Sequence, residues 1–454
     1  MPRARLRGQA INEVLETAVA NVVLALPSLS VGLVGQDTST PCFVQLPSIN
    51  LQDHVQCLEQ PTVESNIPDS GLLSVLERQH DRPWPDIEHR PPWKLIALVR
   101  SPVGDDGLLV FDAVFAVHHA IADGRSTALF HTKLLNELHQ PRGRPTQLCD
   151  RTLSIDGGRK LIQPQEELVK FSTSWFFLLQ TLWCELGPTW LQGQQPEAPW
   201  VGKAITREPC HTELRLVTVS AVAVPRILAA CRANQTTLTP LLHVLVLASL
   251  ARHVRPEEAR AFRSSTPIDL RPFVENNPQA DGGALGVFVT AQSHYFGASA
   301  ITAVRERGGE DQVWRAAAEL RRSMKEHLNS VPKNDIMSML SWVSDWRGFW
   351  LAKVGKPRQD TWEVSNIGSM PGGNEARDES AEGWRIQRSI MSQGATVAGA
   401  AISVNVAGVA GGDICIALGW QDGIVQTETV DSLAGDLQVW LDALGQGKGL
   451  VGTY

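Results

Sequence analysis

The stretch His118-His119-Ala120-Ile121-Ala122-Asp123-Gly124 lies between a predicted strand and a predicted helix. Residues 109–118 form an apolar run that is typical of a strand, and apolar residues at helical spacing predict a helix over 126–139. Because successive side chains on a strand point to opposite faces, His118 and His119 diverge. No other part of the sequence supplies an obvious third ligand, so the stretch is not expected to bind a metal.

One working histidine fits this stretch better than a pair. His119 stands where the predicted strand ends, and an imidazole there suits a general base acting on a hydroxyl or an amine. Asp123 lies on the turn beyond it. Gly124 removes a side chain where the backbone bends sharply or passes close to another group. The alternative interpretation is two hydrogen-bonded histidines beside a helix cap, with no chemical role.

The composition is that of a globular protein. The chain has 454 residues, of which 43% are hydrophobic and 20% charged, so two or three domains with a sizeable core are expected. The formal net charge of −7 predicts no general attraction to nucleic acid or to an anionic membrane surface.

The pattern of cysteines and the N-terminal sequence indicate in which cellular compartment the protein lies. The 7 cysteines are odd in number and widely spaced, without a Cys-x-x-Cys, so neither a disulfide framework nor a zinc knuckle is expected. The basic start of the chain is not followed by the apolar core of a signal peptide, and no transmembrane segment is predicted. We therefore expect a cytoplasmic protein.

The longest aromatic stretch, residues 171–186, predicts a helix. It is too polar and too short to span a bilayer. A helix facing the core is the favoured interpretation, and contact with a membrane interface is the alternative.

Residues 192–210 contain three prolines and no periodic apolar pattern, which indicates a domain boundary. Helices and strands are mixed on both sides of it, so we expect an α/β protein with two lobes, residues 1–195 and residues 196–454. Other predicted elements are a hairpin turn at 104–107, a helix over 334–352, a surface loop over 370–382 and a strand over 384–391.

The pattern His-His-x-x-x-Asp-Gly is the signature of the CoA-dependent acyltransferase superfamily. That superfamily includes the condensation domains of nonribosomal peptide synthesis and chloramphenicol acetyltransferase-like enzymes. Further stretches resemble one branch, the fungal alcohol acetyltransferase family, and the resemblance spans most of the chain. These stretches are Thr266-Pro-Ile-Asp-Leu-Arg-Pro272, Leu285-Gly-Val-Phe-Val289 and Val364-Ser-Asn-Ile-Gly368.

The resemblance implies two chloramphenicol acetyltransferase-like lobes, each a mixed β-sheet flanked by helices, with a tunnel between them. It implies no tightly bound cofactor, acyl-CoA (acetyl-CoA) as co-substrate, and a hydroxylated, largely apolar small molecule of secondary metabolism as acceptor. His119 would take the proton from the acceptor as it attacks the thioester carbonyl, without a covalent enzyme intermediate. A monomer with no nucleic-acid partner is implied.

The same resemblance assigns supporting roles. Asp123 is expected to pair with an arginine of the other lobe and to hold the loop, together with His118 and Gly124. Arg271 matches that arginine; a surface arginine before a proline turn is the alternative. Ser365 and Asn366 resemble a segment near the tunnel, where they would donate to the developing oxyanion or to the acceptor, or would cap the strand end.

Two other functions stay open at this point. A condensation-type enzyme would use an acyl carrier protein as donor, or an amine acceptor to form an amide. A degenerate member would bind an apolar ligand without catalysis. Relatives usually begin with a strand before the first long helix, whereas this chain starts almost directly in a helix over 10–26. The expectation is therefore a truncated chain, or an N-terminal lobe that lacks its first strand.

Overall fold

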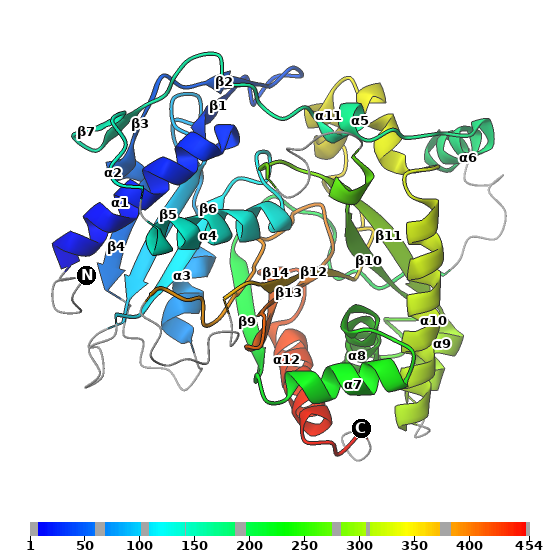
Figure 1. Cartoon of the computed structure of the whole chain (residues 1–454). Helices are drawn as coiled ribbons and strands as arrows, with labels where there is room; N and C mark the ends of the chain where they lie inside the picture. The colour runs from blue at the N-terminus through cyan, green and yellow to red at the C-terminus, as the bar shows by residue number, and fades with distance from the viewer. Residues whose placement is uncertain are drawn as a thin grey trace.

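Figure 1 shows the computed structural model of the chain, which describes residues 8–59, 69–100, 109–140, 142–186, 197–274, 283–305, 309–372 and 383–450. There are two main hydrophobic cores. One is formed by residues between Ile11 and Ile155 together with Leu285, and the other by residues between Val217 and Leu450. The protein is thus an α/β protein with a mixed sheet in each half, as the sequence predicts.

The first core is built on a three-stranded sheet. Its central strand β5 (Trp93–Val99) pairs in parallel with β4 (Val55–Glu59) and antiparallel with β6 (Phe111–Val117). Helices α1 (Gly8–Ala25) and α4 (Gly124–His139) cover one face, and α3 (Ser70–Asp81) covers the other. Because both faces are covered, β5 is apolar nearly throughout, and its sequence shows no polar alternation.

Shorter elements complete the first half. A two-stranded and a three-stranded sheet lie beside α1, both antiparallel, with one short helix before β1 and another after β3. Their bounds are β1 (Val31–Val34), β2 (Cys42–Gln45), β3 (Ser48–Asn50), β7 (Leu148–Cys149), β8 (Thr152–Ser154), η1 (Pro27–Ser30) and α2 (Leu51–His54).

Helices α5 (Gln165–Leu168) and α6 (Trp175–Leu186) pack on elements of the second half (Figure 1). The connecting chain forms bridges from Val169 to Val274 and from Ser172 to Lys333. The chain therefore reaches the second half before residue 186. The predicted boundary at 195/196 lies outside the described residues and stays a prediction.

The second half contains a six-stranded mixed sheet in which β12 is parallel to both of its neighbours. Its strands, in spatial order, are β11 (Val289–Phe296), β10 (Phe262–Asp269), β12 (Trp362–Met370), β13 (Ile402–Val409), β14 (Ile414–Gln421) and β9 (Thr212–Val219). One face is covered by helices around the buried α8 (Leu238–His253). These helices are α7 (Val224–Ala233), α9 (Ala298–Arg305), α10 (Gly309–Ser330) and α12 (Thr427–Gly445).

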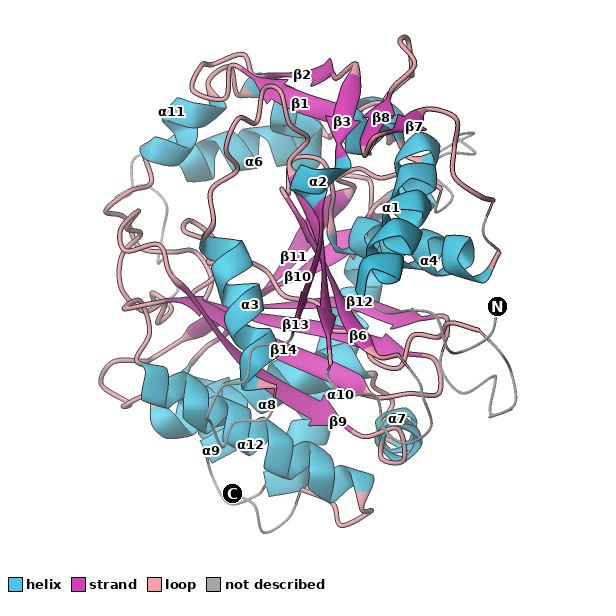
Figure 2. Cartoon of the chain, turned by 90° about the vertical axis from the view of Figure 1, so that its left-hand side faces the viewer, coloured by secondary structure: helices cyan, strands magenta, loops and turns pink. Residues whose placement is uncertain are grey.

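The opposite face of this sheet meets the first half (Figure 2). Trp362 and Val364 are buried among the helices, so the side chains that alternate with them along β12 point to the other face. At the free edge of the sheet α3 contacts β9, where the Leu214 N–H donates to the Glu77 carboxylate at 3.0 Å. The contact between the halves is thus partly polar.

Two predicted elements are wrong. The predicted helix over 334–352 is divided into η4 (Ile336–Trp342) and α11 (Trp346–Leu351), because the Asp345 carboxylate accepts from the Gly348 N–H at 2.8 Å and caps a new helix. Residues 384–391 form no strand. Their polar side chains bind the first half instead, and Arg388 forms a two-pronged ion pair with Asp69.

The predicted helix over 171–186 is present as α6, but the expectation that it faces the core is wrong. Trp175 is 81% exposed and Phe176 is 76% exposed. Leu179 and Trp183 are also exposed, so the described side chains of α6 leave much of their apolar surface uncovered. None of the described helices is long and apolar enough to cross a membrane. The predicted turn at 104–107 and most of the predicted loop at 370–382 lie outside the described residues.

Candidate active site

The histidine motif occupies the turn from β6 into α4. The His118 N–H donates to the Pro92 carbonyl at 2.9 Å, and the His118 carbonyl accepts from the Ile121 N–H at 3.1 Å. Asp123 is the N-cap of α4, where its carboxylate accepts from the Ser126 N–H at 2.8 Å. Backbone hydrogen bonds and the cap therefore fix both ends of the turn that carries the histidines.

The two histidines have different surroundings. His119 is exposed, whereas His118 is partly buried and its Nδ1 accepts from the Ala120 N–H at 3.0 Å. Burial lowers the pKa of His118, and the neighbouring charge of His119 lowers it further. An uncharged His118 whose Nδ1 is already occupied holds the turn, and His119 is the histidine that a reactant can reach.

Arg271 lies directly against Asp123, although 148 residues separate them. Its two terminal nitrogens donate to the two carboxylate oxygens at 2.9 and 3.0 Å. Arg271 belongs to η3 (Arg271–Phe273), which follows β10. Both side chains are buried, so this two-pronged pair joins the motif of the first half to the second half through a charged contact shielded from water.

The pair is part of a larger hydrogen-bonded network. The Phe288 N–H donates to Asp123 at 3.0 Å, and Arg271 also donates to the Ser126 hydroxyl at 2.9 Å and to Asp269 at 3.0 Å. The Ser126 hydroxyl in turn donates to the Gly286 carbonyl at 2.9 Å. These bonds satisfy the buried charges from three separate segments of the chain.

Opposing effects act on the Asp123 carboxyl. Burial alone would raise its pKa, but the hydrogen bonds and charge of Arg271, with the N–H groups of Phe288 and Ser126, hold the pKa below its usual range. Asp123 is therefore ionised across the physiological range and acts as a fixed anchor for the turn.

Gly124 lies where α4 meets the second half. A Cβ atom at this position would lie 2.8 Å from Ile367 Cγ2 and 3.0 Å from Met391 Sδ. Arg125, the next residue, donates to the Ile367 carbonyl at 2.9 Å. Of the two explanations for this glycine, a sharp bend or a close approach, the structure shows the close approach.

Ser365 and Asn366 lie on β12 and point to different faces of the sheet. The Asn366 amide donates to the Thr239 hydroxyl at 3.0 Å, and its oxygen accepts from the Gly368 N–H at 2.9 Å. Asn366 therefore lies on the helix-covered side of the sheet, and through these two bonds it supports the turn after the strand. Ser365 alternates with Val364, so it lies on the face toward the first half.

Glu363 is a titratable residue near the motif that the sequence analysis missed. It lies on the same face as Ser365, and its carboxylate accepts from the Gln393 amide at 3.2 Å. The same amide donates to Asn405 at 2.8 Å. Burial raises the pKa of Glu363, and the charge of His119 acts in the opposite direction and lowers it. His119 and Glu363 thus interact electrostatically across the two halves.

The sequence carried only weak signals for these additional residues. Glu363 interrupts an apolar strand two residues before Ser365, and Asp269 stands two residues before Arg271. Gly286 and Phe288 contribute backbone groups, which no side-chain pattern indicates. In the described parts of the chain, no three His, Cys, Asp or Glu side chains are grouped so that they could hold a metal ion. The expected tunnel stays a prediction.

The chain matches a known protein family over most of its length. Residues 81–435 match the sequence model of the family described as alcohol acetyltransferase. The chain belongs to the alcohol acetyltransferase family. The family predicted from the motif is thereby confirmed, and with it the class of enzyme, an acyltransferase.

Two related alcohol acetyltransferases match most of the chain. The probable alcohol acetyltransferase FCK4 of Fusarium pseudograminearum is 31% identical over 98% of this chain and 88% of its own length. The probable alcohol acetyltransferase crmB of Aspergillus fumigatus is 28% identical over 87% of this chain and 82% of its own length. These homologues are fungal.

Solved structures show the fold that this member of the alcohol acetyltransferase family shares. The trichothecene 15-O-acetyltransferase TRI3 of Fusarium sporotrichioides has a TM-score of 0.66 at 14% identity, covering 97% of this chain and 87% of that one. The first condensation domain of the CDA synthetase has a TM-score of 0.55 at 14% identity, covering 96% and 88%. At these identities the likeness concerns the fold, which is the condensation-domain and chloramphenicol acetyltransferase-like fold predicted from the motif.

Proposed function

We propose that this acyltransferase moves an acetyl or other short acyl group from acyl-CoA to a hydroxyl of a small, largely apolar acceptor. The observation that carries the proposal is the exposed His119 on a turn anchored by the buried Asp123–Arg271 pair. A histidine with only a structural role does not need a two-pronged buried ion pair between distant segments to hold its turn. The same geometry suits a base that must keep its position while the acceptor binds.

His119 acts as general base in the proposed reaction. An imidazole nitrogen of His119 accepts the proton of the acceptor hydroxyl as its oxygen bonds to the thioester carbonyl carbon. When the carbon–sulfur bond breaks, the imidazolium returns the proton to the departing CoA sulfur, which leaves an ester and free CoA. A positioned base of this kind contributes roughly 10²–10⁴ in rate.

The surrounding residues have separate roles in the proposal. Asp123, Arg271, His118 and Gly124 position the turn and do not touch the reactants. Glu363, when ionised, favours the imidazolium that forms during proton transfer, because it and His119 interact electrostatically. Ser365 is the candidate donor to the developing oxyanion. Asn366 is assigned to the strand end, since both ends of its amide are already bonded.

The remaining parts of the proposal come from the sequence analysis and from the resemblance to the family. Acyl-CoA is the co-substrate and no cofactor is held tightly. Residues 1–195 and 196–454 act as two lobes of a monomer, with donor and acceptor meeting between them. The acceptor is a hydroxylated secondary metabolite, and the reaction takes place in the cytoplasm.

The proposal is tested by a screen that identifies donor and acceptor together. Acetyl-CoA is supplied with hydroxylated terpenoid and polyketide acceptors and with amine analogues of the same skeletons, and both free thiol and products are measured. An ester with equimolar CoA supports the proposal. An amide as main product, or acylation only from a carrier-protein thioester, favours the condensation-type function. Specific acceptor binding without any product favours the non-catalytic function.

A further inference from the structure

Exposed apolar side chains are concentrated on α6, η4 and α11. The surface that they form consists of exposed side chains from α6, from η4 and from the segment 346–356 that contains α11, and we call it the aromatic crest. Its members are Trp175, Phe176, Leu179, Trp183, Ile336, Trp342, Phe349, Trp350, Leu351 and Val354. Most of the large apolar side chains that are exposed in the described residues belong to this crest. Exposed patches of this kind on soluble domains mark interaction sites.

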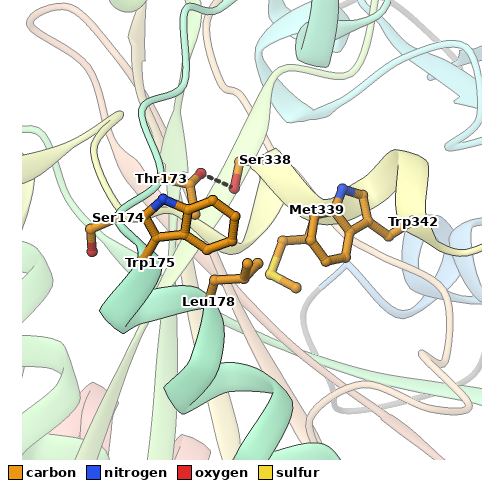
Figure 3. A pocket seen from close by; sticks show the side chains of 7 residues that line it. All are labelled: Thr173, Ser174, Trp175, Leu178, Ser338, Met339 and Trp342. Carbon is orange, nitrogen blue, oxygen red and sulfur yellow. Dashed lines mark hydrogen bonds between the residues drawn. The ribbon is translucent and has the colours of Figure 1, made fainter.

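Specific bonds connect the α6 part of the crest to the η4 part. The Thr173 hydroxyl donates to the Ser338 hydroxyl at 2.8 Å, and the Ser174 N–H donates to the Asn334 side chain at 2.8 Å. Between α6 and η4 lies a pocket of about 180 Å³, in which Trp175 and Leu178 face Met339 and Trp342 (Figure 3). The aromatic side chains are therefore held in place and are not the ends of a loose segment.

The charges of the crest differ from those of the whole chain. The segments 172–184 and 336–344 contain no charged residue, and Glu185 is the one charged residue in the sequence of α6. The segment 346–356 contains Arg347, Lys353 and Lys356 and no carboxylate. The Lys353 ammonium lies 4.5 Å from the ring centres of Phe349 and Trp350. The crest thus places aromatic rings and cations together on a protein whose net charge is −7.

Two of the acidic groups near the crest are already bonded within the fold. Asp345 accepts from the Gly348 N–H as a helix cap, and Asp335 is buried with its carboxylate bonded to Thr290. Arg347 lies 3.8 Å from Asp37, an exposed pair that water and salt screen. Glu166 and Glu167 on the neighbouring α5 are exposed, so the cationic character is strongest on the α11 side.

We propose that the aromatic crest binds the surface of an anionic lipid bilayer. Tryptophan and phenylalanine rings insert at the headgroup level, where an apolar ring body and a polar N–H are both accommodated. Lys353, Lys356 and Arg347 then lie at the height of the lipid phosphates, each contributing electrostatic attraction. The contact is a docking on the membrane surface by short helices, without any spanning segment. It does not depend on the proposed function of the active site.

The test measures co-sedimentation with sucrose-loaded vesicles of phosphatidylcholine alone or mixed with phosphatidylserine. The full chain should bind the mixed vesicles roughly tenfold or more tightly than neutral ones, and added salt should weaken that binding. The double variant Trp175→Ser, Phe176→Ser should bind at least about tenfold more weakly to both vesicles. Lys353→Glu should lose binding to the mixed vesicles only.

Control variants distinguish binding through the crest from nonspecific apolar adsorption to the vesicles. Val222→Ser removes an apolar side chain that is also 76% exposed but lies outside the crest, and it should bind as the unchanged protein does. Thermal unfolding of each variant shows whether the fold is intact. Equal binding by the unchanged protein and the double variant, or no binding to either vesicle, overturns the proposal. A dimer seen by light scattering that disappears in the double variant assigns the crest to a second copy and overturns it as well.

Discussion

The Asp123 carboxylate connects three parts of the chain. It caps α4, pairs with Arg271 and accepts from the Phe288 N–H. We expect Asp123→Asn to lower the stability of the folded chain by about 3 kcal/mol at neutral pH, because the buried Arg271 then loses its two-pronged partner and keeps only the single contact with Asp269. Acyl transfer should fall with it, since the turn that carries His119 loses its anchor. Urea unfolding and initial rates measure the two effects.

The pH dependence of this loss distinguishes the ion pair from simple packing. Burial would raise the pKa of Asp123, but the bonds and charge of Arg271 keep the pKa below its usual range. The carboxylate therefore stabilises the fold above about pH 4, and this contribution is lost as the pH falls toward the pKa of the folded state. The stabilities of the unchanged protein and Asp123→Asn should converge in acid. A constant difference down to that range would exclude the charged pair as the cause.

Glu363 offers a second test at the residue scale. Glu363→Gln removes a carboxyl that interacts electrostatically with His119, so the kcat/KM of acyl transfer should fall severalfold. Glu428→Gln, which changes an exposed carboxylate on α12, is the matched control. An unchanged kcat/KM in Glu363→Gln would show that the carboxyl has no influence on the base.

Functional residues that stand together in a linear motif can be predicted from the sequence. Residues that are brought to the site only by the fold cannot. His119, Asp123 and Gly124 stand together, and Arg271 lies in a stretch similar to the family. Ser126 and Glu363 acquire their contacts only when the two halves meet. The backbone groups of Gly286 and Phe288 carry no side-chain signature at all.

Among the elements, the contact between α4 and β12 depends on the absence of a side chain at Gly124. We expect Gly124→Ala to destabilise the fold by roughly 1–3 kcal/mol, because its Cβ would lie 2.8 Å from Ile367. Gly435→Ala on α12 is the matched control, since nothing lies within 4 Å of its added Cβ. It should stabilise the chain by roughly 0.5–1 kcal/mol. Equal shifts in denaturation midpoint for both variants would contradict the close approach.

Elements with a strong apolar period are predictable, and elements whose environment is set by distant segments are not. The helix predicted over 126–139 is observed as α4 (Gly124–His139), and the helix predicted over 10–26 is observed as α1 (Gly8–Ala25). The aromatic period of α6 is that of a helix, but no period can show that only one side of it is covered. The break at Asp345 between η4 and α11 depends on a single helix cap. Residues 384–391 have the apolar pattern of a strand, although their partners are side chains of the first half.

Across the whole molecule, buried histidines predict sensitivity to acid. Burial lowers the pKa of His80, His131 and His294 to about 4, and these residues lie in both halves. The folded chain keeps them neutral while the unfolded chain protonates them near pH 6.5, so stability should fall as the pH drops from about 6.5 toward 4. His294 alone accounts for ~3 kcal/mol.

Urea unfolding at a series of pH values measures this loss. His294→Gln keeps a side chain that can bond to Thr266 but cannot be protonated, so its stability should fall less steeply over the same range. Parallel curves for the two proteins would show that His294 is not protonated on unfolding in that window.

The net charge of the whole molecule hides the charge of its surfaces. A value of −7 predicts no general attraction to anionic membranes, yet three cations and no carboxylate lie within residues 346–356. Composition averages over the surface, and only the fold shows which charges lie beside exposed aromatic rings. The active-site chemistry is predictable because its motif is local in the sequence. The docking surface is not, because its residues come from separate segments and the composition averages over them.

The central claim is that His119 is the base of acyl transfer. Release of free CoA from acetyl-CoA in the presence of the best hydroxylated acceptor tests it directly, with His119→Ala compared with the unchanged protein. We predict a rate lower by roughly 10²–10⁴ with an unchanged unfolding temperature, because His119 is exposed and supports no core packing. His89→Ala, another exposed histidine, should keep the full rate. CoA release by His119→Ala at the rate of the unchanged protein would contradict the account.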